Sequence, residues 1–116
     1  TPTLVAEEMG RIPKGALMTV SALRSGLARR HGADVTCPLM TGIFYNLIAG
    51  AGEEQLGAGM PALAPYWRVI RDDGTLSPKT PEGPERQAER LRQEGHAVRP
   101  QRSGLQVGDH EQHLVS

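Results

Sequence analysis

The stretch Pro65-Tyr66-Trp67-Arg68-Val69-Ile70, followed by Arg71-Asp72-Asp73-Gly74, decides the fold of this 116-residue chain. It contains the only Trp and one of the two Tyr residues of the sequence. Aromatic and β-branched side chains favour a strand, and an Asp-Gly pair favours a tight turn. We therefore predict a central strand over residues 65–70 and a turn that closes at Gly74. A chain of this length builds one small domain.

Motifs downstream of this stretch occur in the order found in the alkylguanine-DNA alkyltransferases. That family has Pro-Cys-His-Arg-Val, a polar turn with Gly, a Gly-containing loop, a helix and Glu-Gly. The matching positions here are Pro65 to Val69, Asp73-Gly74, Gly83, the helix through Leu91, and Glu94-Gly95. Upstream, Arg11 to Thr19 resembles the family's Ile-Pro-x-Gly-x-Val-x-Thr segment. The resemblance implies a small α+β domain of winged helix-turn-helix type, mostly helical with a short β-hairpin.

The residues that carry the chemistry of that family are replaced. Its acceptor Cys falls on Tyr66 and its activating His falls on Trp67. A phenol stays protonated near neutral pH, so Tyr66 cannot accept an alkyl group as a thiolate does. The resemblance therefore implies a non-enzymatic, alkyltransferase-like protein that binds double-stranded DNA and recognises alkylated or otherwise modified bases, guanine above all, for repair. We expect no cofactor and no metal, and we expect repair proteins as further partners.

A pocket for a flipped base is also implied by the resemblance. The positions that match it are Tyr66, Trp67, Val69, Val20 and Thr80. The backbone carbonyls of Tyr66 and Val69 are acceptors whatever the side chains are. The two aromatic rings could stack on a base or fill the pocket and close it, and a buried Trp beside a strand is more often part of a core.

Two helices in the first half of the chain predict a helix-turn-helix. The first begins at Thr19 or Ser21, ends at His31-Gly32, and places Val20, Leu23 and Leu27 on one apolar face. The second runs from Pro38 to about Ala49, and a loop over residues 49–64 follows. The family opens this second helix with Arg-Ala-Val-Gly, whereas Leu39-Met40-Thr41-Gly42 keeps the Gly and lacks the Arg.

Charge supports two different functions. The net charge is zero, but residues 9–33 carry only basic charges, which are Arg11, Lys14, Arg24, Arg29 and Arg30. If this surface binds the DNA backbone, the expected contacts are Lys14, Thr19, Arg24, Arg30, Thr41 and Gly42. An ordinary solvated surface is the alternative. The uncharged second helix favours burial, and a domain that kept the fold and became a protein-interaction module without DNA binding is the alternative function.

The C-terminal part is predicted to contain one helix and a tail. The helix begins at Pro84 and ends at Gly95, and the ion pairs Glu82/Arg86 and Arg90/Glu94, each spaced i,i+4, are expected on its exposed side. We assign structural roles to Arg68 and Glu94. Glu94 is expected to pair with an Arg such as Arg68 or Arg90, and Arg68 with an acid such as Glu94 or with a backbone carbonyl. The domain is expected to cover residues 1–98, including a first short helix at residues 4–9, and residues 99–116 are expected to be a flexible polar tail.

Cys37 is the only thiol, which rules out an internal disulfide. It lies at a helix N-terminus, but Pro38 and the apolar neighbours favour a buried, inert thiol over an alkyl acceptor. The sequence has no secretory segment and no apolar run long enough to span a bilayer. These features predict an intracellular monomer without a membrane partner, associated with the nucleoid if it binds DNA.

Overall fold

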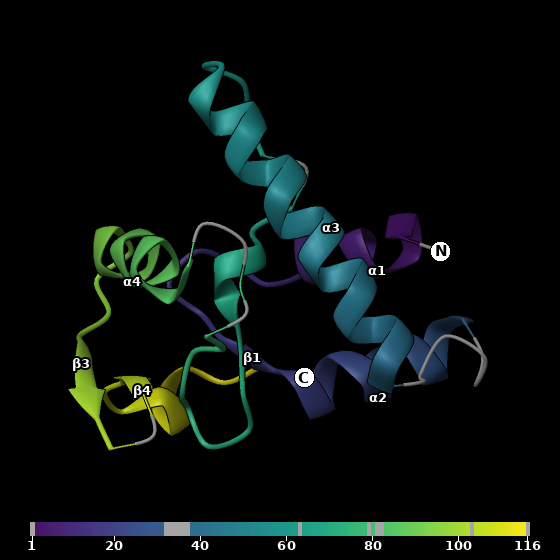
Figure 1. Ribbon diagram of the computed structural model, residues 1–116. Helices are drawn as coiled ribbons and strands as arrows, with labels where there is room; N and C mark the ends of the chain where they lie inside the picture. Colours follow the sequence, from purple (N-terminus) through teal and green to yellow (C-terminus); the bar gives the residue numbers. More distant parts are fainter. Residues whose placement is uncertain are drawn as a thin grey trace.

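A computed structural model of the protein describes residues 2–31, 38–62, 64–78, 80, 83–102 and 104–115. Its helices are α1 (Pro2–Gly10), α2 (Val20–His31), α3 (Pro38–Gly57) and α4 (Gly83–Gln93). Its strands are β1 (Met18–Thr19), β2 (Val69–Ile70), β3 (Val98–Gln101) and β4 (Gly104–Val107), and two short 3₁₀ helices are η2 (Tyr66–Arg68) and η3 (His110–His113). The expected α+β, mostly helical class is confirmed (Figure 1).

Three helices enclose the first of two cores. α1 contacts both α2 and α3, and Val5, Met9, Leu23, Leu27 and Ile48 are buried between them. The predicted start of α2 is confirmed, because the N–H of Ala22 donates to Thr19 Oγ1 at 3.1 Å. Val20 does not belong to the buried face of α2, since 37% of its surface is exposed at the first turn.

The central motif is shorter as a strand than predicted. Only Val69 and Ile70 form β2, which pairs in parallel with Met18 and Thr19 of β1. Residues 66–68 instead form η2, because the N–H of Arg68 donates to the carbonyl of Pro65 and closes a turn. Successive residues in this turn point in different directions, so that the Tyr, Trp and Arg side chains reach different parts of the molecule.

This motif joins the two cores. Tyr66 and Val69 belong to the core of α1, α2 and α3. Ile70 belongs to a second core with residues of α4, β3 and β4, and Trp67 contacts both cores. The prediction that the chain is organised around this stretch is therefore confirmed at the level of packing.

The turn after β2 forms where the Asp-Asp-Gly sequence predicts it. The N–H of Gly74 donates to the carbonyl of Arg71 at 2.9 Å. Gly74 has a φ of 86°, which favours glycine, and a Cβ at this position would collide with the ring of His110. The loop therefore approaches η3 closely only because this residue has no side chain.

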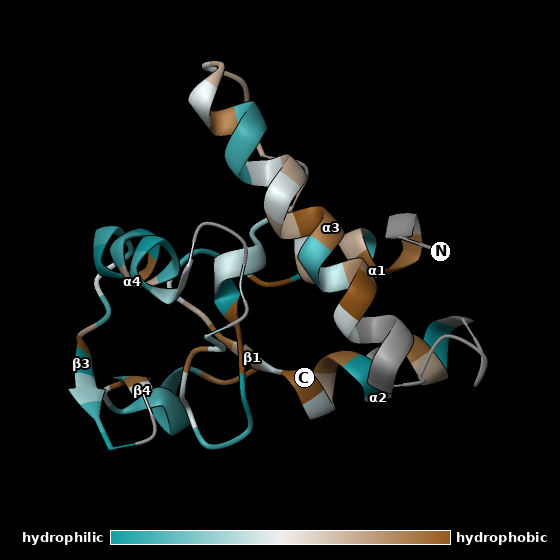
Figure 2. Ribbon diagram, viewed as in Figure 1, coloured by the Kyte–Doolittle hydropathy of each residue, from teal (hydrophilic) through white to brown (hydrophobic). Residues whose placement is uncertain are grey.

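α3 is longer than predicted, and the expected loop over residues 49–64 is wrong as far as Gly57. Its C-terminal half extends beyond the neighbouring elements (Figure 1), with alternating apolar and polar stretches (Figure 2). Long-range contacts explain the extension, because Glu53 bonds to Tyr66 and to Arg90. Such tertiary contacts override the weak helix propensity of a Gly-rich segment.

α4 begins and ends close to the predicted positions, but its ion pairs differ. Arg90 does not pair with Glu94 along the helix; it bonds to Glu53 of α3, and Glu94 bonds to Arg68. Glu82, the other predicted partner, lies outside the described residues. Both arginine pairs therefore connect different elements, which stabilises the tertiary structure more than the exposed side of one helix.

The expected flexible tail after residue 98 is wrong. β3 and β4 form an antiparallel hairpin in which Val98 lies opposite Val107, and both valines are buried. After η3 the chain returns to the centre, where the N–H of Leu17 donates to the His113 carbonyl and the N–H of Val115 donates to the Leu17 carbonyl, both at 2.8 Å. Few apolar residues suffice, because Val98 and Val107 enter an existing core and Leu105 and Val115 pack against the cores. No helix among the described residues has the length and apolar character to cross a membrane.

Candidate functional site

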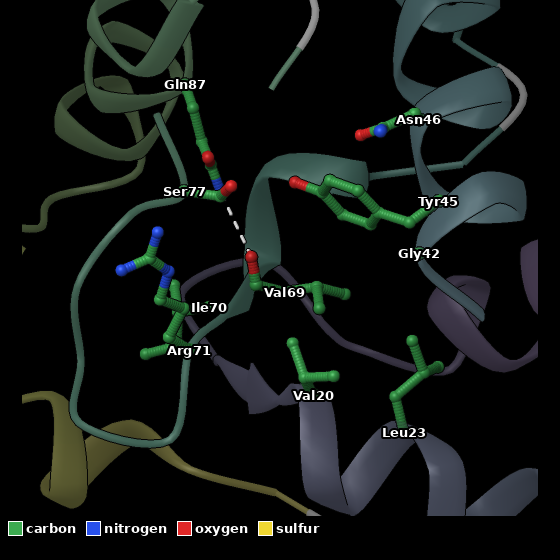
Figure 3. Close-up of a pocket in the computed structure, with 10 residues that line it drawn as sticks. All are labelled: Val20, Leu23, Gly42, Tyr45, Asn46, Val69, Ile70, Arg71, Ser77 and Gln87. Carbon is green, nitrogen blue, oxygen red and sulfur yellow. Dashed lines mark hydrogen bonds between the residues drawn. The ribbon is translucent and has the colours of Figure 1, made fainter. Parts of the chain in front are cut away.

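A cavity of about 290 Å³ lies where the start of α2, the middle of α3 and β2 meet. The residues that line it are Val20, Leu23, Gly42, Tyr45, Asn46, Val69, Ile70, Arg71, Ser77 and Gln87. Figure 3 shows the Tyr45 ring and Asn46 facing the cavity from α3, and Gln87 and Ser77 on the opposite side. Apolar walls with a few polar groups are typical of sites for small organic groups and bases, so this cavity is the candidate binding site.

Two of the five residues predicted for the base pocket line this cavity. They are Val20 and Val69. The other three, which are Tyr66, Trp67 and Thr80, are not among its lining residues. The Tyr66 side chain is fully buried and points to Glu53, and the Thr80 hydroxyl donates to the Ser77 carbonyl at 2.9 Å. Neither aromatic ring of the central motif forms a wall on which a base could stack in this structure.

Five polar residues of the cavity were missed in the sequence. Tyr45 and Asn46 come from α3, Arg71 and Ser77 from the segment after β2, and Gln87 from α4. The available signal was the adjacent Tyr45-Asn46 pair, which interrupts an otherwise apolar stretch of the second helix. Gln87 gives no such signal, because its inward orientation depends on where α4 docks.

The two backbone carbonyls expected to accept hydrogen bonds from a base already have donors. Gln87 Nε2 donates to the Val69 carbonyl at 2.9 Å and to the Trp67 carbonyl at 3.2 Å. The Tyr45 hydroxyl donates to the Tyr66 carbonyl at 3.4 Å. Burial raises the pKa of Tyr45 above its ordinary value, so this phenol remains a neutral donor. A carbonyl has a second lone pair, and a ligand would have to share these acceptors with the internal donors.

Tyr66, which the sequence resemblance aligned with a nucleophile, forms part of a buried ionic network. Its hydroxyl donates to Glu53 Oε2 at 2.5 Å, and the guanidinium of Arg90 donates to both oxygens of Glu53 at 2.9 and 3.1 Å. Burial, the hydrogen bond to Glu53 and the negative charge of Glu53 together raise the pKa of Tyr66. The phenol therefore stays protonated at neutral pH and is not a nucleophile.

Glu94, which the sequence resemblance aligned with an activating Glu, forms an ion pair with Arg68. Arg68 NH2 lies 2.6 Å from Glu94 Oε2, and Arg68 Nε lies 2.9 Å from Glu94 Oε1. The remaining guanidinium nitrogen donates to the Ile12 carbonyl at 2.7 Å. Burial raises the pKa of Glu94, but the hydrogen bonds and charge of Arg68 outweigh it, so the pKa lies below its ordinary value. The expected contact between these two residues is present.

The predicted backbone-binding residues differ in how available they are. Arg30 NH1 bonds to the buried Glu8 at 2.8 Å, and Thr19 Oγ1 caps α2. Lys14 is exposed, and Gly42 lies at the cavity. Arg24 borders a second, shallower hollow that also includes Ser21, Arg71 and Asp72. The side chain of Thr41 and the whole of Cys37 lie outside the described residues.

Comparison with known proteins identifies a shared fold. No protein-family model and no curated protein sequence matches the chain. The structure is similar to that of S. pombe Atl1 in complex with damaged DNA containing O6-carboxymethylguanine, with a TM-score of 0.69, 20% sequence identity, and coverage of 99% of this chain and 94% of Atl1. It is also similar to S. pombe ATL in complex with DNA, with a TM-score of 0.68 and the same identity and coverage. The expected winged helix-turn-helix fold is thereby confirmed.

Proposed function

We propose that this protein is a non-enzymatic, alkyltransferase-like DNA-binding protein that recognises alkylated or otherwise modified bases and marks them for repair. The observation that carries the proposal is the cavity between α2, α3 and β2, which has largely apolar walls and neither a thiol nor a His among its described lining residues. The likeness to Atl1 in complex with damaged DNA supports the same function, because it extends over nearly the whole of both chains.

The state of Tyr66 supports a binding protein over an enzyme. An alkyl acceptor must be an ionised or readily ionised nucleophile. Tyr66 is buried, protonated and hydrogen-bonded to Glu53, and Glu94 is committed to Arg68. A base that entered the cavity would be held by contacts alone and released unchanged.

The proposed DNA surface consists of α2 and the exposed side of α3 at the cavity. Basic residues of α2 would contact phosphates, and Gly42 would allow close approach of the α3 backbone to the groove. We assign phosphate contacts to Lys14, Arg24 and the exposed Arg29, with Thr19 and Thr41 nearby. Arg30 is retained as a weaker candidate, because its guanidinium is already bonded to Glu8.

Binding to three duplexes at two salt concentrations tests this proposal. The duplexes share one sequence and differ at one position, which is guanine, O6-methylguanine or O6-carboxymethylguanine. We expect tighter binding to a modified duplex than to the unmodified one. Replacing Arg29 by Ala should weaken binding to all three and flatten the salt slope by about one unit, as the loss of one phosphate contact does. The matched control, Arg102→Ala in the β3–β4 turn, should leave the slope as it was. Absence of duplex binding at low salt would refute the proposal.

A protein-interaction module is the second candidate, because α3 exposes apolar side chains. Ile43 is 44% exposed and Leu47, one turn further, is 57% exposed. Exposed apolar residues on one helix face are typical of contacts with another protein. Replacing both residues by Ser should leave duplex binding unchanged if they serve only a protein partner.

A further inference from the structure

The polar groups that line the cavity fall into two classes. Gln87 and Tyr45 are already hydrogen-bonded to backbone carbonyls of the central motif. The guanidinium of Arg71 and the amide of Asn46, by contrast, make no hydrogen bond or ion pair with any described residue. Uncommitted donors at a cavity are the groups with which a ligand can form new bonds.

Arg71 is fixed in position by its backbone. Its N–H donates to the Thr75 carbonyl at 3.0 Å, and its carbonyl accepts from the N–H of Gly74 at 2.9 Å. It therefore sits at the start of a closed turn that follows β2 directly. Figure 3 shows its guanidinium on the side of the cavity opposite Tyr45, below Ser77. The closed turn fixes the backbone position from which the Arg71 side chain extends along the cavity.

Arg71 also carries the only charge among the described residues that line the cavity. The nearest acids in sequence have hydrogen-bond donors of their own: the Asp72 carboxylate accepts from the N–H and hydroxyl of Ser21, and Asp73 accepts from the N–H and hydroxyl of Thr75. The bonds from Thr75 and, to a smaller extent, the charge of Arg71 lower the pKa of Asp73. Arg71 is half-buried beside Val20 and Ile70, where water screens a charge less than in bulk solvent. A planar guanidinium in such a place favours a carboxylate, which it can bind through two parallel hydrogen bonds.

We propose that Arg71 is a specificity-determining residue of this cavity, and that it favours a modified guanine whose added group ends in a carboxylate over one whose added group is uncharged and of similar size. This inference rests on the proposed function of the cavity as a base-binding site. It assigns to Arg71 the recognition of the added group, whereas Gln87 and Tyr45 keep the carbonyls of the central motif occupied.

Matched duplexes carrying guanine, O6-propylguanine or O6-carboxymethylguanine at one position test the inference, because the two added groups are similar in size and differ in charge. We expect the wild-type protein to bind the carboxymethyl duplex about tenfold more tightly than the propyl duplex, as one charge-assisted hydrogen-bonded pair would give. Arg71→Met, which keeps the length of the side chain, should remove this preference and leave propyl binding within about twofold of wild type. Arg71→Lys should retain part of the preference.

Two controls separate this outcome from general effects. Arg29→Ala removes a positive charge from the exposed surface of α2 and should weaken all three complexes by the same factor. A thermal melt of Arg71→Met close to that of wild type shows that the variant is folded. An equal carboxymethyl-to-propyl ratio in wild type and Arg71→Met would overturn the role of Arg71 while leaving the proposed function intact. Failure of both modified duplexes to bind more tightly than guanine would overturn the proposed function itself.

Discussion

The hydroxyl of Tyr66 donates a 2.5 Å hydrogen bond to Glu53 Oε2, and this bond connects the centre of the chain to the extended half of α3. Arg90 of α4 binds the same carboxylate, so three elements meet at one buried charge. Burial raises the pKa of Glu53, but the bonds from Arg90 and Tyr66 outweigh it and the pKa is lowered. Tyr66 therefore stabilises the contact between η2 and α3, and its side chain does not line the cavity.

Replacing Tyr66 by Phe should lower the free energy of unfolding by about 2 kcal/mol, because it removes a hydrogen bond to a charged acceptor. The aromatic ring and its packing are retained. Tyr45→Phe is the matched control and should cost less, since the Tyr45 hydroxyl bonds to neutral groups, among them the Tyr66 carbonyl at 3.4 Å. Urea unfolding of the three proteins measures the difference. The preference for the modified over the unmodified duplex should be the same in Tyr66→Phe and in wild type. A changed preference would show that Tyr66 contacts the bound base.

The wild-type protein should transfer no alkyl group. Tyr66 is protonated and buried, and Trp67 cannot act as a base. Incubation with an oligonucleotide containing O6-methylguanine, followed by intact mass measurement, checks this expectation. A stoichiometric gain of one methyl group would contradict it, and peptide mapping would then show whether Cys37 is the acceptor.

The sequence predicted the elements whose signals are local. The start of α2 at Thr19, the turn at Gly74 and the contact of Arg68 with Glu94 all follow from motifs a few residues long or from matched positions. The extension of α3 to Gly57 and the β3–β4 hairpin could not be predicted in the same way. Both depend on partners far along the chain, such as Arg90 for Glu53 of α3, and Gly74 and Leu76 for β4 of the hairpin.

The residues that line the cavity were likewise predictable from the sequence only in part. Val20 and Val69, which were predicted for the base pocket from their positions in the motifs, both line the cavity. Arg71 and Gln87 were missed because neither residue has a local feature that points inward. Their positions follow from how the turn after β2 and α4 dock against β2, which is a property of the tertiary structure alone.

Breaking the ion pair between Arg68 and Glu94 should be costly. The Arg68 side chain is 14% exposed and that of Glu94 is 8% exposed, so removing one partner leaves a charge buried without compensation. We expect Arg68→Ala to lower the free energy of unfolding by about 3 kcal/mol. The exposed Glu89→Gln serves as the control and should change it by less than about 0.5 kcal/mol. In a double-mutant cycle, Arg68→Ala with Glu94→Ala should cost clearly less than the sum of the single changes; additive costs would contradict the pairing.

A Cβ at Gly26 should force the ends of the Glu8 and Arg30 side chains to shift, because α2 approaches the buried Glu8 of α1 at this point. An added Cβ would lie 2.7 Å from Glu8 Oε2 and 2.9 Å from Arg30 NH1, and would displace this ion pair. Gly26→Ala should therefore destabilise the protein although Ala favours helices by about 1 kcal/mol. Gly42→Ala is the matched control, since no heavy atom lies within 4 Å of its added Cβ. Thermal melts should move in opposite directions for the two variants, and a stabilised Gly26→Ala protein would disprove the close approach.

Stability should fall as the solution becomes mildly acidic, and His96 should be a cause. This residue is 7% exposed, and its ring packs edge-to-face with the ring of His113, with the two ring centroids 4.9 Å apart. Burial lowers the pKa of His96 below its ordinary value of 6.5; the charge of His113 adds to the lowering, and Glu94 opposes it. Just below pH 6.5 the unfolded chain therefore binds a proton that the folded protein excludes. Protonation then favours the unfolded state, so stability declines until the pH reaches the pKa of His96 in the folded protein.

Replacing His96 by Phe keeps an aromatic ring against His113 and removes the titrating group. The free energy of unfolding, measured in urea between about pH 7 and pH 5, should then depend less on pH than in wild type. This range lies above the ordinary pKa of 4.5 of Glu53 and Glu94. The pKa values of both carboxyl groups are lowered in the folded protein, so the stability that they contribute is lost only at lower pH. They therefore do not affect the pH dependence measured between about pH 7 and pH 5. An unchanged slope in His96→Phe would show that His96 stays solvated, and that the contact with His113 does not control stability in this range.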